Sequence, residues 1–187
     1  MNLPEPVETM ASPLRMDYTY VAGAGRSVFL RGLAERRLLA RRCPGCSLVY
    51  APAPEFCSRC LRPVGPPFEL SGHGEVATFC VVNFPFPGQA YEPPYVVAHI
   101  ALDGADTRLM HLVREVAPER VTIGLRVEPV WVDDDELDTS TTSIRYFRPI
   151  STPPPPPPPT RLGWGTTEAP GYDNFSTRST ADGPADA

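Results

Sequence analysis

Four cysteines in two close pairs constrain the fold of this chain more than any other feature. Cys43 and Cys46 enclose Pro-Gly, Cys57 and Cys60 enclose Ser-Arg, and ten residues separate the pairs. Each pair presents two thiolates from one tight turn, and two such turns facing each other supply the four sulfur ligands that zinc prefers. The spacing therefore predicts a structural zinc site, because four sulfur ligands leave no open position for catalysis. A disulfide or redox role is the alternative.

The length and the proline content indicate one ordinary domain, one small module and non-globular ends. The chain has 187 residues, of which 25 are proline, far above the average share. We expect a flexible arm over 1–25, a helix and zinc ribbon over 26–67, a barrel over 68–150 and a disordered tail over 151–187. The prolines 153–159 favour polyproline II, either as a plain tail or as a ligand for a profilin- or SH3-type domain.

Residues 26–35 are typical of a short amphipathic helix with Ser27 as a candidate N-cap. Gly32 within it costs up to about 1 kcal/mol relative to alanine, so the helix should need a packing surface. Residues 37–42 are expected to run as an extended lead into the first cysteine turn. The apolar helical face comprises Phe29, Leu30 and Leu33.

After Gly72 the pattern changes to short β-strands. Alternation and turn signals predict five of them, over 75–82, 95–102, 108–113, 125–132 and 143–147. Neither face of the first is polar, which is typical of a strand that curves around a small barrel. The predicted fold class is mainly β: a five-stranded OB-fold barrel, preceded by a short helix and a small zinc ribbon.

Charge is distributed unevenly between the two predicted parts. Residues 26–62 carry eight arginines against two glutamates, a balance of +6, whereas residues 69–149 carry six arginines against thirteen carboxylates, a balance of −7. An anionic partner should therefore meet the ribbon. No apolar stretch is long enough to span a bilayer and the N-terminus lacks a secretory signal, so we expect a cytoplasmic protein without membrane contact.

Several single residues belong to types that can act in catalysis, but their context does not support that role. Cys80 is expected to be a small buried hydrophobe, and the spacing of its candidate base partners, His73, His99 and His111, supports no catalytic pair. The run Asp133–Glu136 lacks the glycine of a calcium loop and is interpreted as an exposed hairpin tip. Asp103 and Asp106 flank Gly104 at a predicted turn, and aspartate is common in turns, so neither residue needs a catalytic role.

Four arginines beside the first cysteine turn are the most suggestive charges. They could clamp phosphates through bidentate guanidinium contacts, or they could form a solvated basic face. The sequence leaves both readings open. The four are Arg36, Arg37, Arg41 and Arg42.

Together these motifs resemble the acyl-CoA-associated OB-fold family with an N-terminal rubredoxin-like zinc ribbon, long known only as a domain of unknown function. The resemblance covers about residues 18–150 and departs from the family at Ser47 and Leu61, where many relatives have glycine. The motifs that carry it are Cys43-Pro-Gly-Cys46, Cys57-Ser-Arg-Cys60, Ser71-Gly-His-Gly-Glu-Val76, Pro94-Tyr-Val-Val-Ala98, Leu102-Asp-Gly-Ala-Asp106, Ile123-Gly-Leu-Arg-Val127 and Tyr146-Phe-Arg-Pro149.

The resemblance implies a role beside thiolase-fold enzymes, including acyl-CoA thiolases and the lipid-transfer-protein aldolases of steroid side-chain breakdown. In such assemblies the partner carries the catalysis, and the zinc-ribbon protein bridges it to an enzyme such as a hydratase. We therefore expect a non-catalytic accessory subunit with structural Zn²⁺. The helical face 29–33 would dock to the partner, the arginines would bind CoA phosphates, and a loop with Phe84, Phe86 and Tyr91 would line a path for the pantetheine arm.

Two other functions compete with this expectation. OB-fold barrels bind single-stranded nucleic acid through basic grooves and stacking aromatic residues, but here the barrel is acidic, so nucleic acid is the less favoured partner. The third hypothesis is a stand-alone hydrolase or redox protein that uses Cys80 or the paired thiolates.

Overall fold

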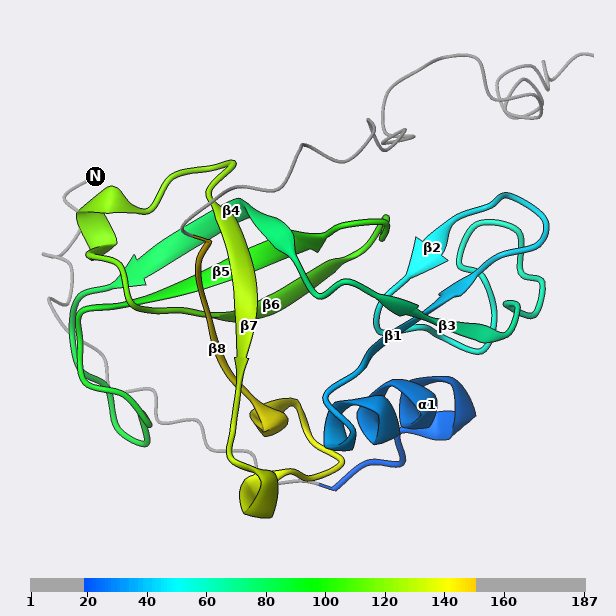
Figure 1. Ribbon diagram of the computed structural model, residues 1–187, viewed down its shortest axis with the longest axis horizontal. Helices are drawn as coiled ribbons and strands as arrows, with labels where there is room; N and C mark the ends of the chain where they lie inside the picture. The colour runs from blue at the N-terminus through cyan, green and yellow to red at the C-terminus, as the bar shows by residue number, and fades with distance from the viewer. Residues whose placement is uncertain (1–18, 151–187) are drawn as a thin grey trace, which may run out of the picture.

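The computed structural model describes residues 19–150, in which a ribbon module with one helix lies against a β-barrel (Figure 1). The predicted tail and most of the predicted N-terminal arm lie outside this range. Among the helices of these residues, none combines the length and the apolar composition that a bilayer crossing requires.

Helix α1 runs from Gly23 to Ala34 and begins three residues before the predicted start. The prediction of Ser27 as the N-cap was wrong, because this residue lies inside the helix and its hydroxyl donates to the Gly23 carbonyl at 2.6 Å. A side chain of the ribbon accepts a free backbone amide at the start of the helix instead. The Glu55 carboxylate accepts the Ala24 amide at 3.1 Å, so a tertiary contact replaces the local cap.

The apolar face of α1 packs inward. Phe29 and Leu33 are 2% and 0% exposed and belong to the main core, with Leu30 partly buried against it. A Cβ atom on Gly32 would lie 2.8 Å from the Arg37 carbonyl oxygen, so only glycine allows this close approach. The helix thus has the packing surface that it needs, and the expectation that its apolar face docks to a partner is wrong.

The ribbon sheet has three strands in the order β2-β1-β3. They are β1 (Leu38–Arg42), β2 (Val49–Tyr50) and β3 (Pro67–Leu70), with β1 antiparallel to both neighbours. The predicted extended lead into the first cysteine turn is therefore the central strand β1. The predicted boundary between residues 67 and 68 falls inside β3.

The barrel closes in the order β4-β5-β6-β8-β7. All five predicted strands are present, with ends that differ by at most two residues from the prediction. Strands β6 and β8 are parallel and pair at one position only, Val113 with Phe147, so the barrel closes at this seam with little backbone pairing. The strands are β4 (Gly74–Val82), β5 (Tyr95–Leu102), β6 (Arg108–Val113), β7 (Arg126–Trp131) and β8 (Ile144–Pro149), and short 3-10 helices η1 (Pro118–Arg120), η2 (Asp134–Glu136) and η3 (Thr141–Ser143) occupy the loops.

The turn between β5 and β6 joins the barrel to the ribbon. The Asp106 carboxylate accepts the Val49 amide at 2.7 Å, and the Asp106 amide donates to the Val49 carbonyl at 2.9 Å. Next to it, the Thr107 hydroxyl accepts the Ala51 amide at 2.8 Å and donates to the Ala51 carbonyl at 3.2 Å. These bonds cover the outer edge of β2, so Asp106 does more than shape its own turn.

Ribbon and barrel also share one hydrophobic core. Leu38 from β1 and Val49 from β2 belong to the same buried cluster as Ile100 and Phe147 of the barrel. Because this apolar surface is continuous, we infer that the two parts unfold as one cooperative unit rather than as independent domains.

Replacement of Asp106 by alanine should lower the free energy of unfolding by about 1–3 kcal/mol, since the partly buried Val49 amide loses its acceptor. Urea denaturation would measure this loss. Asp135→Ala is the matched control, because Asp135 is an exposed carboxylate of η2 with no polar contact among residues 19–150. Equal stability of the two variants would contradict the role of Asp106 as the joint.

Candidate functional site: a sulfur cage and a barrel groove

The four paired cysteines converge as predicted. The Sγ atoms of Cys43 and Cys60 lie 3.3 Å apart, those of Cys46 and Cys57 lie 3.5 Å apart, and all four lie within 4.8 Å of one another. None of them is joined in a disulfide. Zinc bound to four thiolates at about 2.3 Å holds its sulfur atoms about 3.8 Å apart. The donors therefore have the right chemistry, number and spacing for tetrahedral zinc.

The two cysteine turns repeat one geometry. In the first, the Ser47 amide donates to the Cys43 carbonyl at 2.9 Å, and in the second the Leu61 amide donates to the Cys57 carbonyl at 2.9 Å. The residue after each pair is left-handed, with φ of 63° at Ser47 and 56° at Leu61. Glycine adopts this conformation without strain, which accounts for the glycine of the family pattern at the two positions where this chain has Ser47 and Leu61.

The local hydrogen bonds divide the thiols into two kinds. Burial acts to raise the pKa of Cys57, but the Tyr50 hydroxyl and backbone amides outweigh it and lower the pKa to about 6. The neighbouring cysteine sulfurs raise the pKa of Cys60 to about 12. Zinc would therefore find one thiolate largely formed and would displace the proton of the other.

Tyr50 of β2 covers the cage. Its ring is 6% exposed, and its hydroxyl oxygen lies 3.1 Å from the Cys57 sulfur and 3.1 Å from the Ser58 hydroxyl. A hydrogen bond to a ligating sulfur orients the ligand and moderates its charge. Tyr50 is thus the outer support of the metal site.

The cage changes the charge of the ribbon. Four thiolates exceed the charge of one Zn²⁺ by about two negative units. The Arg62 side chain lies over Gly45 beside the Cys60 sulfur, where it offsets part of this charge. The balance of +6 over residues 26–62 falls to about +4 once the zinc thiolates are counted.

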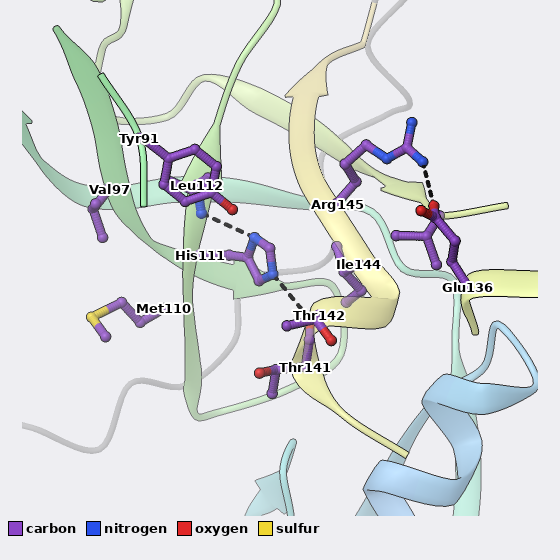
Figure 2. A pocket seen from close by; sticks show the side chains of 11 residues that line it. Tyr91, Val97, Met110, His111, Leu112, Glu136, Thr141, Thr142, Ile144 and Arg145 are labelled. Carbon is purple, nitrogen blue, oxygen red and sulfur yellow. Dashed lines mark hydrogen bonds and ion pairs between the residues drawn. The ribbon is translucent and has the colours of Figure 1, made fainter. Parts of the chain in front are cut away.

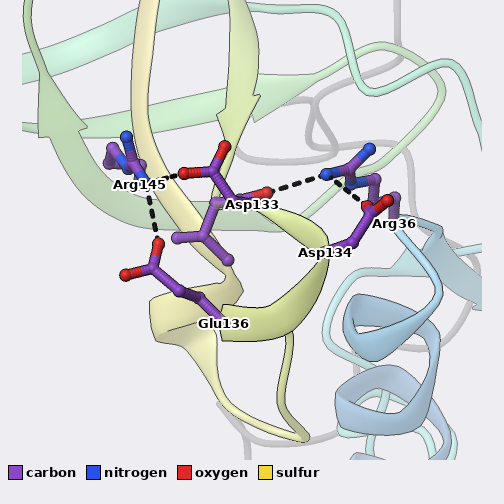
Figure 3. A network of polar contacts seen from close by, with 6 residues as sticks. Arg36, Asp133, Asp134, Glu136 and Arg145 are labelled. Atoms are coloured by element: carbon purple, nitrogen blue, oxygen red, sulfur yellow. Dashed lines mark hydrogen bonds and ion pairs between the residues drawn. The ribbon is translucent and has the colours of Figure 1, made fainter.

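Arg36 and Arg37 are paired with carboxylates of the chain. The Arg36 guanidinium lies 2.7 Å from Asp134 and donates to the Val132 carbonyl at 2.9 Å, so it links the end of α1 to the barrel (Figure 3). Arg37 lies 2.8 Å from Glu69 of β3. Both pairs are exposed, and exposed pairs contribute little to stability.

Arg41 and Arg42 brace the ribbon. The Arg41 guanidinium donates to the Gly65 carbonyl at 2.6 Å, and that of Arg42 donates to the Ser47 carbonyl at 3.1 Å and lies 5.8 Å from the Phe68 ring centroid. As successive strand residues they point to opposite faces of the sheet, so the four arginines do not converge. Their binding of CoA phosphates stays a prediction.

The carboxylate run between β7 and β8 forms an exposed tip, as predicted. Arg145 of β8 lies 2.8 Å from Glu136 and 3.3 Å from Asp133, so one exposed cation is shared by the first and last carboxylates of the run (Figure 3). Across residues 19–150, the cysteine cage is the one group of three or more side chains placed to hold a metal ion.

A groove of about 870 Å³ lies on the barrel beside the weakly paired seam between β6 and β8 (Figure 2). This volume lies in the usual range of small-molecule sites, about 300–1,000 Å³. Its charged lining residues, Glu136 and Arg145, are paired with each other. The apolar lining side chains include Val97 of β5, Met110 and Leu112 of β6, Val132 just after β7, and Ile144 of β8.

His111 is the polar centre of this groove. Its Nδ1 atom accepts the Leu112 amide at 3.0 Å, which leaves the proton on Nε2, 3.4 Å from the Thr141 carbonyl oxygen (Figure 2). Burial lowers the pKa of His111, so the ring stays neutral at pH 7. From the sequence, His111 was considered only as an unsupported base partner for Cys80, and its place in a groove was not predicted. The available signal was the alternation of β6, which places His111 on the same face as the buried Leu109 and Val113.

Two further expectations need correction. Cys80 is exposed rather than buried, because strand alternation in β4 turns Phe79 and Val81 toward the core instead. Of the three aromatic residues expected along a ligand path, Tyr91 lines the groove, while Phe84 and Phe86 are 72% and 51% exposed and lie outside its lining.

Comparisons with known proteins match both parts of the molecule. Residues 31–64 match a family model described as the ChsH2 rubredoxin-like zinc ribbon domain, and residues 68–132 match the ChsH2 C-terminal OB-fold domain. A DUF35 domain-containing scaffold protein of Methanocaldococcus jannaschii is 34% identical over 116 residues, which cover 60% of this chain and 82% of that protein. The chain belongs to the DUF35 family.

Other DUF35 relatives agree with this assignment. A DUF35 domain-containing scaffold protein of Pyrococcus furiosus is 32% identical over 61% of this chain and 84% of its own length. A solved structure described as the Ltp2-ChsH2(DUF35) aldolase has a chain that is 28% identical, with a TM-score of 0.53, over 68% of this chain and 95% of that one.

One relative is much longer than the region it shares. A probable enoyl-CoA hydratase alpha subunit of Thermomonospora curvata is 34% identical over 54% of this chain, but the match spans only 31% of the hydratase subunit. Together the scaffold relatives and the aldolase structure support the role of a partner subunit for this DUF35 protein.

Metal analysis of the purified chain should find one equivalent of zinc. Tyr50→Phe should release zinc to a chelator about 10–100-fold faster than wild type, because the Cys57 sulfur loses its hydroxyl partner while the ring still fills the core. Release can be followed with a colorimetric zinc indicator. The control is Tyr95→Phe in the barrel, and equal release rates for both variants would contradict the supporting role of Tyr50.

Proposed function

We propose that this chain is a non-catalytic accessory subunit that binds a thiolase-superfamily enzyme and supports the conversion or transfer of acyl-CoA. The observation that carries the proposal is the likeness to the Ltp2-ChsH2(DUF35) aldolase, together with the DUF35 scaffold relatives. The chemistry of the described residues agrees. The sulfur cage is coordinatively closed, and no histidine nitrogen lies within hydrogen-bond distance of Cys80 across residues 19–150.

The finer parts of the proposal concern the partner and its substrate. A lipid-transfer-protein-type aldolase is the favoured partner, with steroid-derived acyl-CoA as the candidate substrate, because the aldolase likeness covers 95% of the solved chain. A hydratase is the candidate neighbour in the assembly, since one relative is described as a hydratase subunit. Cytoplasmic location follows from this role as part of the same proposal.

The groove beside His111 is the proposed site for the acyl thioester on this subunit. A lining without unpaired charge favours an uncharged chain, and one fixed N–H donor favours a carbonyl oxygen. The present acceptor is 3.4 Å away, longer than a typical hydrogen bond, so a ligand oxygen at about 2.9 Å would compete well for the proton.

The arginines 36, 37, 41 and 42 would then serve the CoA phosphates only by exchanging their present contacts. Arg42 is the best placed, because it is exposed and its hydrogen-bond partner is a backbone carbonyl rather than a carboxylate. Bidentate phosphate binding would be stronger than that neutral contact.

Coexpression with a lipid-transfer-protein-type aldolase or a thiolase from the same genome tests the function. We expect a stable complex on size-exclusion chromatography and an increase of at least tenfold in the partner's turnover of acyl-CoA. The chain alone should show no turnover. Failure to form a complex with either enzyme class, and no change in rate, would overturn the proposal.

His111→Phe should weaken binding of an uncharged thioester by about tenfold, because it keeps the ring but removes the N–H donor. The probe is S-butanoyl-N-acetylcysteamine, followed by shifts of the Leu112 and Thr142 amide signals in NMR titrations of the zinc-loaded chain. His99→Phe is the control, since His99 lies outside this groove. Equal affinity of both variants would exclude the groove as the thioester site.

A further inference from the structure

Leu61 combines two unfavourable properties in one position. It is 79% exposed, so a large apolar side chain faces water. It also has a φ of 56°, a left-handed backbone conformation that is strained for a leucine. Glycine at this position would remove both costs.

The first cysteine turn shows that the geometry itself does not require an apolar side chain. Ser47 occupies the equivalent position, with φ of 63° and the same amide hydrogen bond to the first cysteine of its pair. It is polar and exposed, as expected for a turn in water. The leucine of the second turn therefore serves no purpose that is visible in the isolated chain.

A second exposed apolar side chain belongs to the same loop as Leu61. Phe56 is 55% exposed and pairs with Pro63 through a β-bridge on the same turn. Arg59 and Arg62 flank Leu61 and are exposed, and within residues 19–150 neither guanidinium has an ion-pair partner. The surface is thus an apolar centre between two exposed cations that have no carboxylate partner among the described residues, and Arg62 also lies beside the Cys60 sulfur.

We propose that the second cysteine turn is the docking point for the partner subunit, with Leu61 as its anchor and Phe56 beside it. The complementary surface is an apolar pocket with carboxylates at its rim, which would pair with Arg59 and Arg62. Strain kept at an exposed position is typical of contact sites, because the bound state is where the side chain is buried. The identity of the partner as an enzyme subunit rests on the proposed function.

A protein pocket fits this surface better than nucleic acid. The negative zinc-thiolate cage lies directly beneath the turn and reduces the attraction for phosphates. An aliphatic side chain at the centre offers no flat ring on which a base could stack. A pocket rimmed by carboxylates satisfies both the apolar centre and the flanking charges.

The test compares Leu61→Gly with Ser47→Gly in the full zinc-loaded chain. Both changes relieve left-handed strain, so both should raise the melting temperature by about 2–4 °C. Only Leu61→Gly should weaken binding to the partner enzyme, by at least about tenfold, as measured by calorimetry against that purified enzyme. A variant that becomes more stable yet binds more weakly is not explained by a merely structural role.

Two further variants control for changes in turn flexibility. Leu61→Met keeps a large apolar side chain and should bind within about threefold of wild type, whereas Leu61→Asn tolerates the left-handed backbone but should bind as weakly as Leu61→Gly. If the wild type forms the complex and Leu61→Gly binds equally well, the docking point is wrong while the proposed function stands. If the wild type forms no complex, the proposed function itself fails. Tight binding of a mixed-sequence single-stranded oligonucleotide that is lost in Leu61→Gly would replace the protein partner with nucleic acid.

Discussion

Sulfur coordination is the constraint on which the rest of the molecule depends. The strands of the ribbon pack on the shared core, but the two cysteine turns have only a small buried cluster of their own around Cys43 and Cys57, too small to hold the turns by packing alone. With the cage closed, β2 keeps the position at which Asp106 and Thr107 of the barrel can bond to its edge. Metal binding is therefore coupled to the placement of the barrel as well as to the folding of the ribbon.

The sequence was most informative where chemistry is local. Cysteine spacing identified the ligands, and alternation identified all five barrel strands, because both signals are carried by residues close together in the chain. It failed where distant residues decide the outcome. Ser27 loses its capping role because Glu55, far along the chain, satisfies the start of α1. The face with Phe29 was mistaken for a docking surface because no local pattern shows which surface a helix will cover.

The candidate sites show the same contrast between local and long-range signals. The cage was expected from the sequence, because its ligands lie in two close pairs. Of the groove, only the place of Tyr91 was expected, because the rest of the lining depends on the seam between β6 and β8 and on a loop that brings Thr141 to His111. Only the folded barrel places those groups together. The arginines show the opposite error, because closeness in sequence suggested a cluster that strand geometry then separates.

The repeated geometry of the cysteine turns has a consequence for assembly. Two equivalent turns around one ion have approximate twofold symmetry. A surface with that symmetry could bind a partner in either of two orientations. The difference between Ser47 and Leu61 breaks that symmetry, because one turn exposes a polar side chain and the other an apolar one. In the proposed complex, bound zinc would hold the two turns rigidly, and the single difference between Ser47 and Leu61 would fix which turn faces the partner.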